Sequence, residues 1–209
     1  TEFTYDDADN LTSMTDKKVS GEAENIYRYT AYEYDGFNRL TGVSECDTSE
    51  VPSAETIAAN KVSYTYNSKD KLTAIDYPDC ALGVKGLRFE YNIHGWLTGI
   101  KAVNKSGFEK DLRVHYYEYD KNSQITRETT INRYGQSNGA VYKEIHTYTY
   151  NTLGQLSSSH LTKMSDEENV VETNIYNYQY DTAGNRIQEY KEMGRHDGYT
   201  TDYTYNEFN

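Results

Sequence analysis

The sequence has few of the residues that usually build or interrupt a globular core. It has 209 residues, of which only two are Pro, two are Cys, five are Phe and one is Trp. Two cysteines say little about the cellular compartment and do not oppose secretion. The scarcity of proline, together with 14% aromatic residues, argues against a disordered chain. No apolar run approaches the ~20 residues that a membrane-spanning helix needs. No signal-peptide pattern opens the chain, which leaves a cytoplasmic protein or a segment of a longer polypeptide.

Positive charge is also scarce. The chain has 21 Lys and Arg residues and 33 Asp and Glu residues, so its net charge is −12. A surface that binds nucleic-acid phosphates is therefore disfavoured. The abundant residue is Tyr, with 23 copies. Most of the apolar surface must come from these amphipathic rings, and each buried ring needs a hydrogen-bond partner for its hydroxyl group.

One four-residue unit occurs eight times, at intervals of 25 to 32 residues. It consists of an aromatic residue, a polar residue, Tyr, and then Asp or Asn. Aromatic residues at alternate positions lie on one face of a β-strand, and Asp or Asn opens a type I turn because its short side chain accepts hydrogen bonds from nearby amides. The last two residues of the unit are Tyr5 and Asp6, Tyr34 and Asp35, Tyr66 and Asn67, Tyr91 and Asn92, Tyr119 and Asp120, Tyr150 and Asn151, Tyr180 and Asp181, and Tyr205 and Asn206.

The residues after each unit predict a tight turn and a return strand. Three residues past the Asp or Asn, seven of the eight copies have Gly, Asn or Asp, which tolerate positive φ. Ser123 is the exception, and we expect it to adopt positive φ unless Asn122 takes that role. Leu or Ile then opens the return strand, except in the seventh copy, where Arg186 stands there. For this copy we predict a one-residue bulge that moves Ile187 inward, the alternative being different packing of the repeat.

A second set of turns, of variable length, closes the other edge of each repeat. The dipeptides Ser106-Gly107, Asn138-Gly139 and Asp197-Gly198 favour hairpins. The polar loop from Glu45 to Asn60 is long enough for a helical turn over Ser53 to Asn60. Eight forward and seven return strands predict an all-β fold of consecutive antiparallel β-hairpins in a long meander. Because strand twist accumulates, we expect it to curve strongly, as one array over residues 1–209 whose first and last repeats are incomplete.

Two segments carry a family resemblance. Tyr34-Asp35-Gly36-Phe37-Asn38-Arg39-Leu40-Thr41 and Tyr180-Asp181-Thr182-Ala183-Gly184-Asn185-Arg186 resemble the tyrosine-aspartate (YD) repeat of the Rhs family, and the repeats span essentially the whole chain. Members of that family are large secreted or surface proteins. The resemblance implies a segment of a spiralling β-shell, which in bacterial toxins encloses a C-terminal effector. The intervals here are longer than in that family, and neither its core-associated segment nor an effector domain is recognisable.

The sequence shows no pattern typical of a catalytic, cofactor or metal site. His94, His115, His146, His160 and His196 lack metal-ligand spacing, so we expect packing roles for them. The acidic run from Asp6 to Asn10 is interpreted as a turn, with a cation site as the alternative. Trp96 either packs over the adjacent hairpin or contacts a ligand. Cys46 and Cys80 are predicted to be free thiols, unless flexible loops bring them together.

These observations predict a non-enzymatic scaffold segment of a large bacterial surface or secreted protein. Its expected partners are flanking domains of the same polypeptide or an enclosed effector, and its expected location is extracellular or at the cell surface. The chain stops within its eighth hairpin, which we interpret as the boundary of an excerpt. The alternative is a carbohydrate- or protein-binding module that uses the aromatic rows, since repeated sites add avidity. A hydrolase with a site in the Glu45 to Asn60 loop is the third class.

Overall fold

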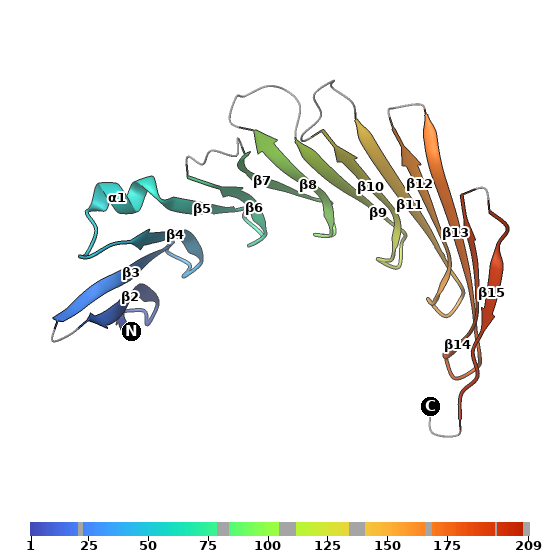
Figure 1. The fold of residues 1–209 in the computed structure, drawn as a ribbon, viewed down its shortest axis with the longest axis horizontal. Coiled ribbons are helices and arrows are strands. Elements are labelled where there is room, and N and C mark those ends of the chain that lie inside the picture. The colour runs from blue at the N-terminus through green and yellow to red at the C-terminus, as the bar shows by residue number, and fades with distance from the viewer. Residues whose placement is uncertain are drawn as a thin grey trace. The chain divides into compact units, whose positions relative to one another are not determined.

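The computed structural model describes residues 1–20, 23–78, 84–104, 112–133, 141–165, 169–194 and 196–206, without the side chains of residues 18–20 and 23–27. In this part of the chain fifteen strands form one sheet, and each strand neighbours those before and after it in sequence (Figure 1). The predicted all-β meander of hairpins is confirmed. The curvature of the whole array and its extent as a single domain stay predictions.

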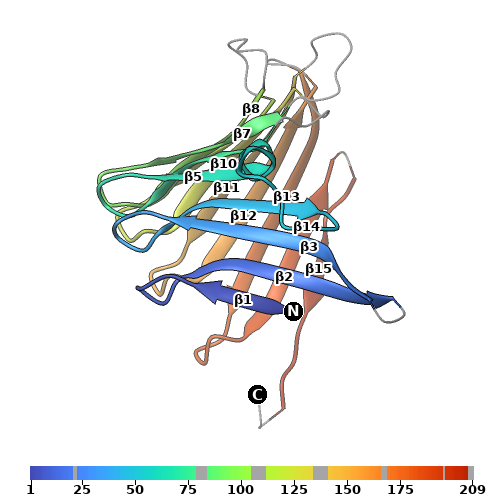
Figure 2. The same ribbon diagram turned by 90° about the vertical axis from the view of Figure 1, so that its left-hand side faces the viewer.

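The chain divides into two compact units. The first comprises Thr1–Phe89 and Ala102–Lys110, and the second Glu90–Lys101 and Asp111–Asn209. Figure 2 shows β1, β2 and β3 of the first unit side by side. From the N-terminus to Tyr91 the elements are β1 (Glu2–Tyr5), β2 (Leu11–Ser20), β3 (Ala23–Tyr34), β4 (Leu40–Asp47), α1 (Ala54–Ala59), β5 (Lys61–Tyr66), β6 (Leu72–Asp76) and β7 (Val84–Tyr91).

The second unit continues the same pattern. Its strand pairs from β9 to β15 are antiparallel. β15 ends at Asp202, so the eighth YD unit lies beyond the last strand, although the Tyr203 amide still donates to the Ile187 carbonyl at 2.9 Å. The remaining strands are β8 (Leu97–Asn104), β9 (Arg113–Tyr119), β10 (Ile125–Asn132), β11 (Tyr142–Tyr150), β12 (Leu156–Met164), β13 (Val170–Tyr180), β14 (Arg186–Met193) and β15 (Tyr199–Asp202).

Side chains alternate between the two faces of the sheet as predicted. In β11 the rings of Tyr148 and Tyr150 are half-buried, whereas Thr149 between them is exposed. The register is known for six of the described hairpins that close at a YD turn. In each of them the last Tyr of the unit pairs with the first residue of the return strand. The register of the two strands shifts directly beside this pair. The repeated units are therefore built to one plan.

The seventh repeat follows this plan. Its register shifts beside the pair of Tyr180 and Arg186 and skips Ile187, so the predicted one-residue bulge is present, but it is common to the other repeats and Arg186 keeps the place of Leu. Arg186 pairs with Tyr180 in the same register as Leu156 pairs with Tyr150. Arg186 fits the aromatic face because its guanidinium carbon lies 5.5 Å from the centre of the Tyr178 ring and 5.0 Å from that of Tyr203. A cation over aromatic rings replaces the apolar side chain of the other repeats.

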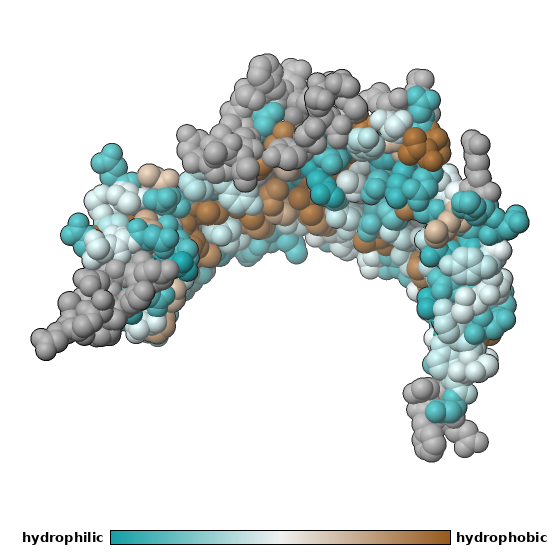
Figure 3. Space-filling model, in the orientation of Figure 1, coloured by the Kyte–Doolittle hydropathy of each residue, from teal (hydrophilic) through white to brown (hydrophobic). Residues whose placement is uncertain are grey.

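The described part of the sheet has almost no fully buried core. Among its apolar residues only Cys46, Ala74 and Val114 are buried, and brown hydrophobic residues reach the surface among hydrophilic ones in Figure 3. A single layer leaves both faces accessible, so cross-strand pairs and hydrogen bonds must contribute much of the stability. Buried polar residues accompany this thin core: Ser13, Thr15, Thr30, Ser44 and Asn174.

The predicted helical turn in the long loop is confirmed as α1. The Ser53 hydroxyl oxygen caps it by accepting a hydrogen bond from the Thr56 amide at 3.2 Å, and Asn60 forms its C-terminal cap. With six residues, α1 is too short to cross a membrane, and the described residues contain no other helix.

Candidate functional site at the repeat junctions

Each described YD turn is held by the same set of hydrogen bonds around its Asp or Asn. In the second repeat one carboxylate oxygen of Asp35 accepts from the amides of Phe37 at 2.9 Å and Arg39 at 3.1 Å. The hydrogen bond from the Arg39 side chain is the main cause that lowers the pKa of Asp35. The same pair of amide bonds occurs at Asp6, Asn67, Asn92, Asp120, Asn151 and Asp181. The turn role predicted for these seven residues is confirmed.

The predicted left-handed position of the turn is also confirmed. Positive φ occurs at Asp9, Asn38, Asp70, Gly95, Ser123, Gly154 and Gly184, whereas Asn209 lies outside the described residues. Ser123 has φ 64°, so the alternative in which Asn122 takes this role is wrong. The reason is that the backbone bond from residue 123 to the Asp120 carbonyl, at 3.2 Å, fixes the turn at the same residue as in the other repeats.

Ser123→Gly is expected to stabilise the protein. Glycine removes the strain of a side chain at positive φ, which costs about 1 kcal/mol. Its greater freedom in the unfolded chain offsets part of this gain. Urea unfolding should show an increase of about 0.5 kcal/mol. Both variants lose the bond from the Ser123 hydroxyl to the Asn122 carbonyl, but Ser123→Ala keeps the strain and should therefore give no increase.

The last Tyr of the unit reaches back to the preceding repeat. The Tyr150 hydroxyl donates to the Ile125 carbonyl at 2.7 Å, and the Tyr180 hydroxyl donates to the Leu156 carbonyl at 2.9 Å. In each case the acceptor is the first residue of the preceding return strand. The same bond joins Tyr34 to Leu11, Tyr66 to Leu40, Tyr119 to Leu97 and Tyr205 to Arg186. These hydroxyl bonds link successive repeats, which satisfies the polar ends of the rings.

Tyr150→Phe is expected to lower the free energy of unfolding by about 1 kcal/mol, because one hydrogen bond between repeats is lost. Hydrogen exchange of the turn between β9 and β10 should become faster. Tyr5→Phe is the matched control, since Tyr5 is 60% exposed and its hydroxyl makes no hydrogen bond to the described residues. Equal destabilisation by both substitutions would contradict a specific role for the hydroxyl bond.

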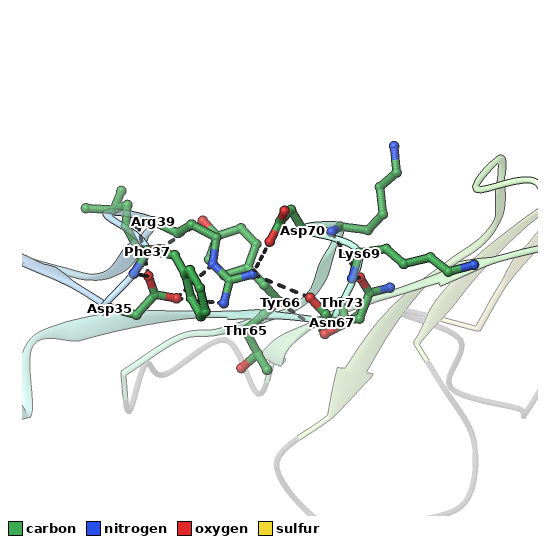
Figure 4. A network of polar contacts seen from close by, with 11 residues as sticks. Asp35, Phe37, Arg39, Thr65, Tyr66, Asn67, Lys69, Asp70 and Thr73 are labelled. Carbon is green, nitrogen blue, oxygen red and sulfur yellow. Dashed lines mark hydrogen bonds and ion pairs between the residues drawn. The ribbon is translucent and has the colours of Figure 1, made fainter.

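The residue just after the positive-φ position reaches forward to the next repeat. Arg39 lies over the Tyr66 ring at 4.8 Å, pairs with Asp70 at 2.6 Å and donates to the Asn67 carbonyl at 3.4 Å (Figure 4). In the fifth repeat the equivalent Gln124 donates to the Gly154 carbonyl at 2.8 Å. Each such junction is thus held in both directions, by a hydroxyl bond backward and a side chain forward.

Trp96 occupies the same forward-reaching position. The centre of its ring system lies 5.3 Å from that of Tyr119 in the next repeat and 4.9 Å from that of His94. The structure therefore places Trp96 over the adjacent hairpin, which was the first of its two interpretations. An open hollow of about 660 Å³ lies beside these rings and also includes Tyr117 and Lys121. Contact of Trp96 with a ligand stays a prediction.

Two of the other candidate residues, His115 and Asp6, make contacts within the fold. The His115 Nδ1 atom lies 3.0 Å from the Thr130 hydroxyl, and the Asp6 carboxylate is occupied by the amides of its own turn. Within the described ranges, no group of three His, Cys, Asp or Glu side chains is arranged to hold a metal ion. Cys46 is a buried free thiol, as predicted. Cys80 and the predicted turns Ser106-Gly107 and Asn138-Gly139 lie outside the described residues.

Known proteins share this fold. No protein-family model and no curated protein matches the sequence. A chain in the crystal structure of TcdB2-TccC3-Cdc42 aligns with 98% of this chain at 19% identity, with a TM-score of 0.69. A chain in the crystal structure of TcdB2-TccC3 without its hypervariable C-terminal region aligns equally well. This chain spans 10% of the length of each of those chains. The likeness establishes a common fold.

Proposed function

We propose that this chain is a structural scaffold segment of a large YD-repeat protein. The observation that supports this most strongly is the junction chemistry, because the side chains of the repeated motif are used to join one hairpin to the next. Asp35 caps its own turn, Tyr34 bonds the preceding repeat and Arg39 bonds the following one. The fold shared with TcdB2-TccC3 chains, of which this chain spans one tenth, is consistent with a segment of a long array.

In this proposal the segment forms part of a β-shell or stalk that encloses or presents another domain. Its partners are flanking domains or an effector within the same polypeptide, and the protein acts outside the cell or at its surface. The mechanism is geometric and needs no catalytic turnover. Hairpins add edge to edge, and a wall of paired strands separates the enclosed domain from solvent and proteases.

Limited proteolysis tests the proposal. The polypeptide that carries this segment and its downstream domain would be digested beside the isolated downstream domain, and the lifetime of that domain compared. Protection inside the intact polypeptide is expected. Equal rates of cleavage would contradict an enclosing role. The remaining form of the proposal would be a stalk, for which small-angle scattering should show an extended particle.

A binding module is the second candidate, favoured by the hollow beside Trp96, His94 and Tyr119. Aromatic rings that border an open hollow are suited to stacking against sugar rings. Trp96→Ala should abolish binding on a glycan array if this function is correct. Trp96→Arg is the matched variant, since Arg39 shows that arginine at this position holds the next Tyr ring. Glycan binding that survives both substitutions would contradict a role for Trp96.

A further inference from the structure

The fifth and seventh repeats carry the same unusual carboxylate on the aromatic face. Glu128 in β10 pairs with Tyr117 in β9, and Glu189 in β14 pairs with Tyr178 in β13. Both glutamates stand three residues after the start of their return strand. In the first four repeats this position is apolar, with Met14, Val43, Ile75 and Ile100, and in the sixth it is Ser159. Each glutamate also accepts a hydrogen bond from a Tyr of the following repeat, at 3.2 Å from Tyr148 to Glu128 and at 2.9 Å from Tyr203 to Glu189.

In the seventh repeat this arrangement holds a guanidinium group. Arg186 lies over the rings of Tyr178 and Tyr203, at 5.5 and 5.0 Å, and one of its nitrogens lies 3.9 Å from the Glu189 carboxylate. The two rings and the acid therefore form a cage for one cation. In this repeat the cation is the guanidinium group of Arg186. A planar guanidinium suits such a cage because it stacks on aromatic faces while donating to a carboxylate.

The fifth repeat has the same acid and two equivalent rings but no arginine at the matching position. Ile125 occupies the position of Arg186, and both residues pair with the last Tyr of their unit.

Glu128 forms no ion pair with any described residue. Arg127 points to the opposite face, where it lies 3.8 Å from Glu118. His146 pairs with Glu128 across the strands, and Thr201 takes that place in the seventh repeat. Glu128, Tyr117 and Tyr148 are all partly accessible to solvent.

The ionisation of the tyrosines agrees with this difference between the repeats. Burial, and then the charge of Glu128, raise the pKa of Tyr148 to about 12, and no cation opposes the rise. In the seventh repeat, burial and Glu189 raise the pKa of Tyr178, but Arg186 acts in the opposite direction. The carboxylate of the fifth repeat thus stands among aromatic rings without the guanidinium group that accompanies Glu189 in the seventh.

We propose that the cage formed by Tyr117, Glu128 and Tyr148 binds a guanidinium group, such as an arginine side chain of another polypeptide segment. The site is a second copy of the one that Arg186 fills within this chain. The inference depends on the internal comparison of two repeats and not on the proposed scaffold function, so either can fail without the other.

Titration with methylguanidinium, monitored by NMR of labelled tyrosine rings, tests the site in the full chain. The rings of Tyr117 and Tyr148 should shift to saturation, and urea, which has a similar shape but no charge, should give no saturation. Glu128→Gln should weaken binding about tenfold or more. Absence of saturable shifts in the wild-type protein, or unchanged affinity in the Glu128→Gln variant, would overturn the proposal.

An exchange of the two residues that distinguish the repeats gives a sharper test. Ile125→Arg should fill the fifth cage from within the chain and abolish binding of methylguanidinium. Arg186→Ile should open the seventh cage, so that the rings of Tyr178 and Tyr203 shift as well and two equivalents bind. Binding by a folded Ile125→Arg variant as tight as that of the wild type would contradict the cage. If that variant does not fold, Arg186→Ile and Glu128→Gln still decide the question.

Discussion

Gly86→Ala is expected to destabilise the first unit by about 3 kcal/mol, because the added methyl group collides with backbone atoms. A Cβ atom at Gly86 would lie far inside contact distance of the Ile75 carbonyl oxygen, and also close to the Asp76 Cα atom, in the neighbouring strand β6. The pairing of β6 with β7 would have to open to admit it. Urea unfolding should show the loss, and hydrogen exchange should become faster first along β6 and β7.

Gly36→Ala is the control for this substitution. No atom lies within 4 Å of a Cβ at Gly36, which is in the turn of the second repeat. Its stability should change by less than about 0.5 kcal/mol. If Gly86→Ala were tolerated as well as Gly36→Ala, the close approach of β6 and β7 described here would be incorrect.

Alkaline pH is expected to unfold the protein through its tyrosine rows. Burial is the main cause that raises the pKa of Tyr117, Tyr119, Tyr150 and Tyr178 above the ordinary value of 10.0, and that of Tyr148 rises to about 12. The folded state therefore binds these protons more tightly than the unfolded state. Their contribution to stability is complete below about pH 10 and is lost as the pH rises towards 12.

Urea unfolding at a series of pH values, together with the ultraviolet absorbance of tyrosinate, measures this effect. The free energy of unfolding should fall steeply above about pH 10, and part of the tyrosinate signal should appear only as the protein unfolds. Glu128→Gln should make the fall shallower, because the charge of Glu128 helps to raise the pKa of Tyr117, Tyr119, Tyr148 and Tyr150. Titration of every tyrosine near pH 10 without loss of structure would refute the prediction.

Features that depend on a few adjacent residues were predictable from the sequence. The type I turn after Tyr34, the positive φ of Asn38 and the alternation of Tyr148, Thr149 and Tyr150 all follow from local preferences. The helical turn at Ser53 was predictable for the same reason, because its cap is local. Such interactions join residues two to four positions apart, so the pattern contains both partners.

Features that join different repeats were missed or mispredicted. Arg186 looked like a break in the pattern, and only its position over the rings of Tyr178 and Tyr203 explains how it replaces Leu. Gly86, like Gly42 and Gly99, lies within a strand, where only the neighbouring strand shows why a side chain would not fit. The recurring glutamates in the fifth and seventh repeats were a usable signal, since they interrupt an apolar position.

The sequence by itself determined the hairpin, because the rings, the Asp or Asn and the left-handed residue lie within one short segment and act through local geometry. Only the tertiary structure decided what the outer ends of those side chains contact. The Tyr150 hydroxyl and the Ile125 carbonyl are 25 residues apart. The loops between repeats vary in length, so the partners of each ring become known only when neighbouring strands are in register.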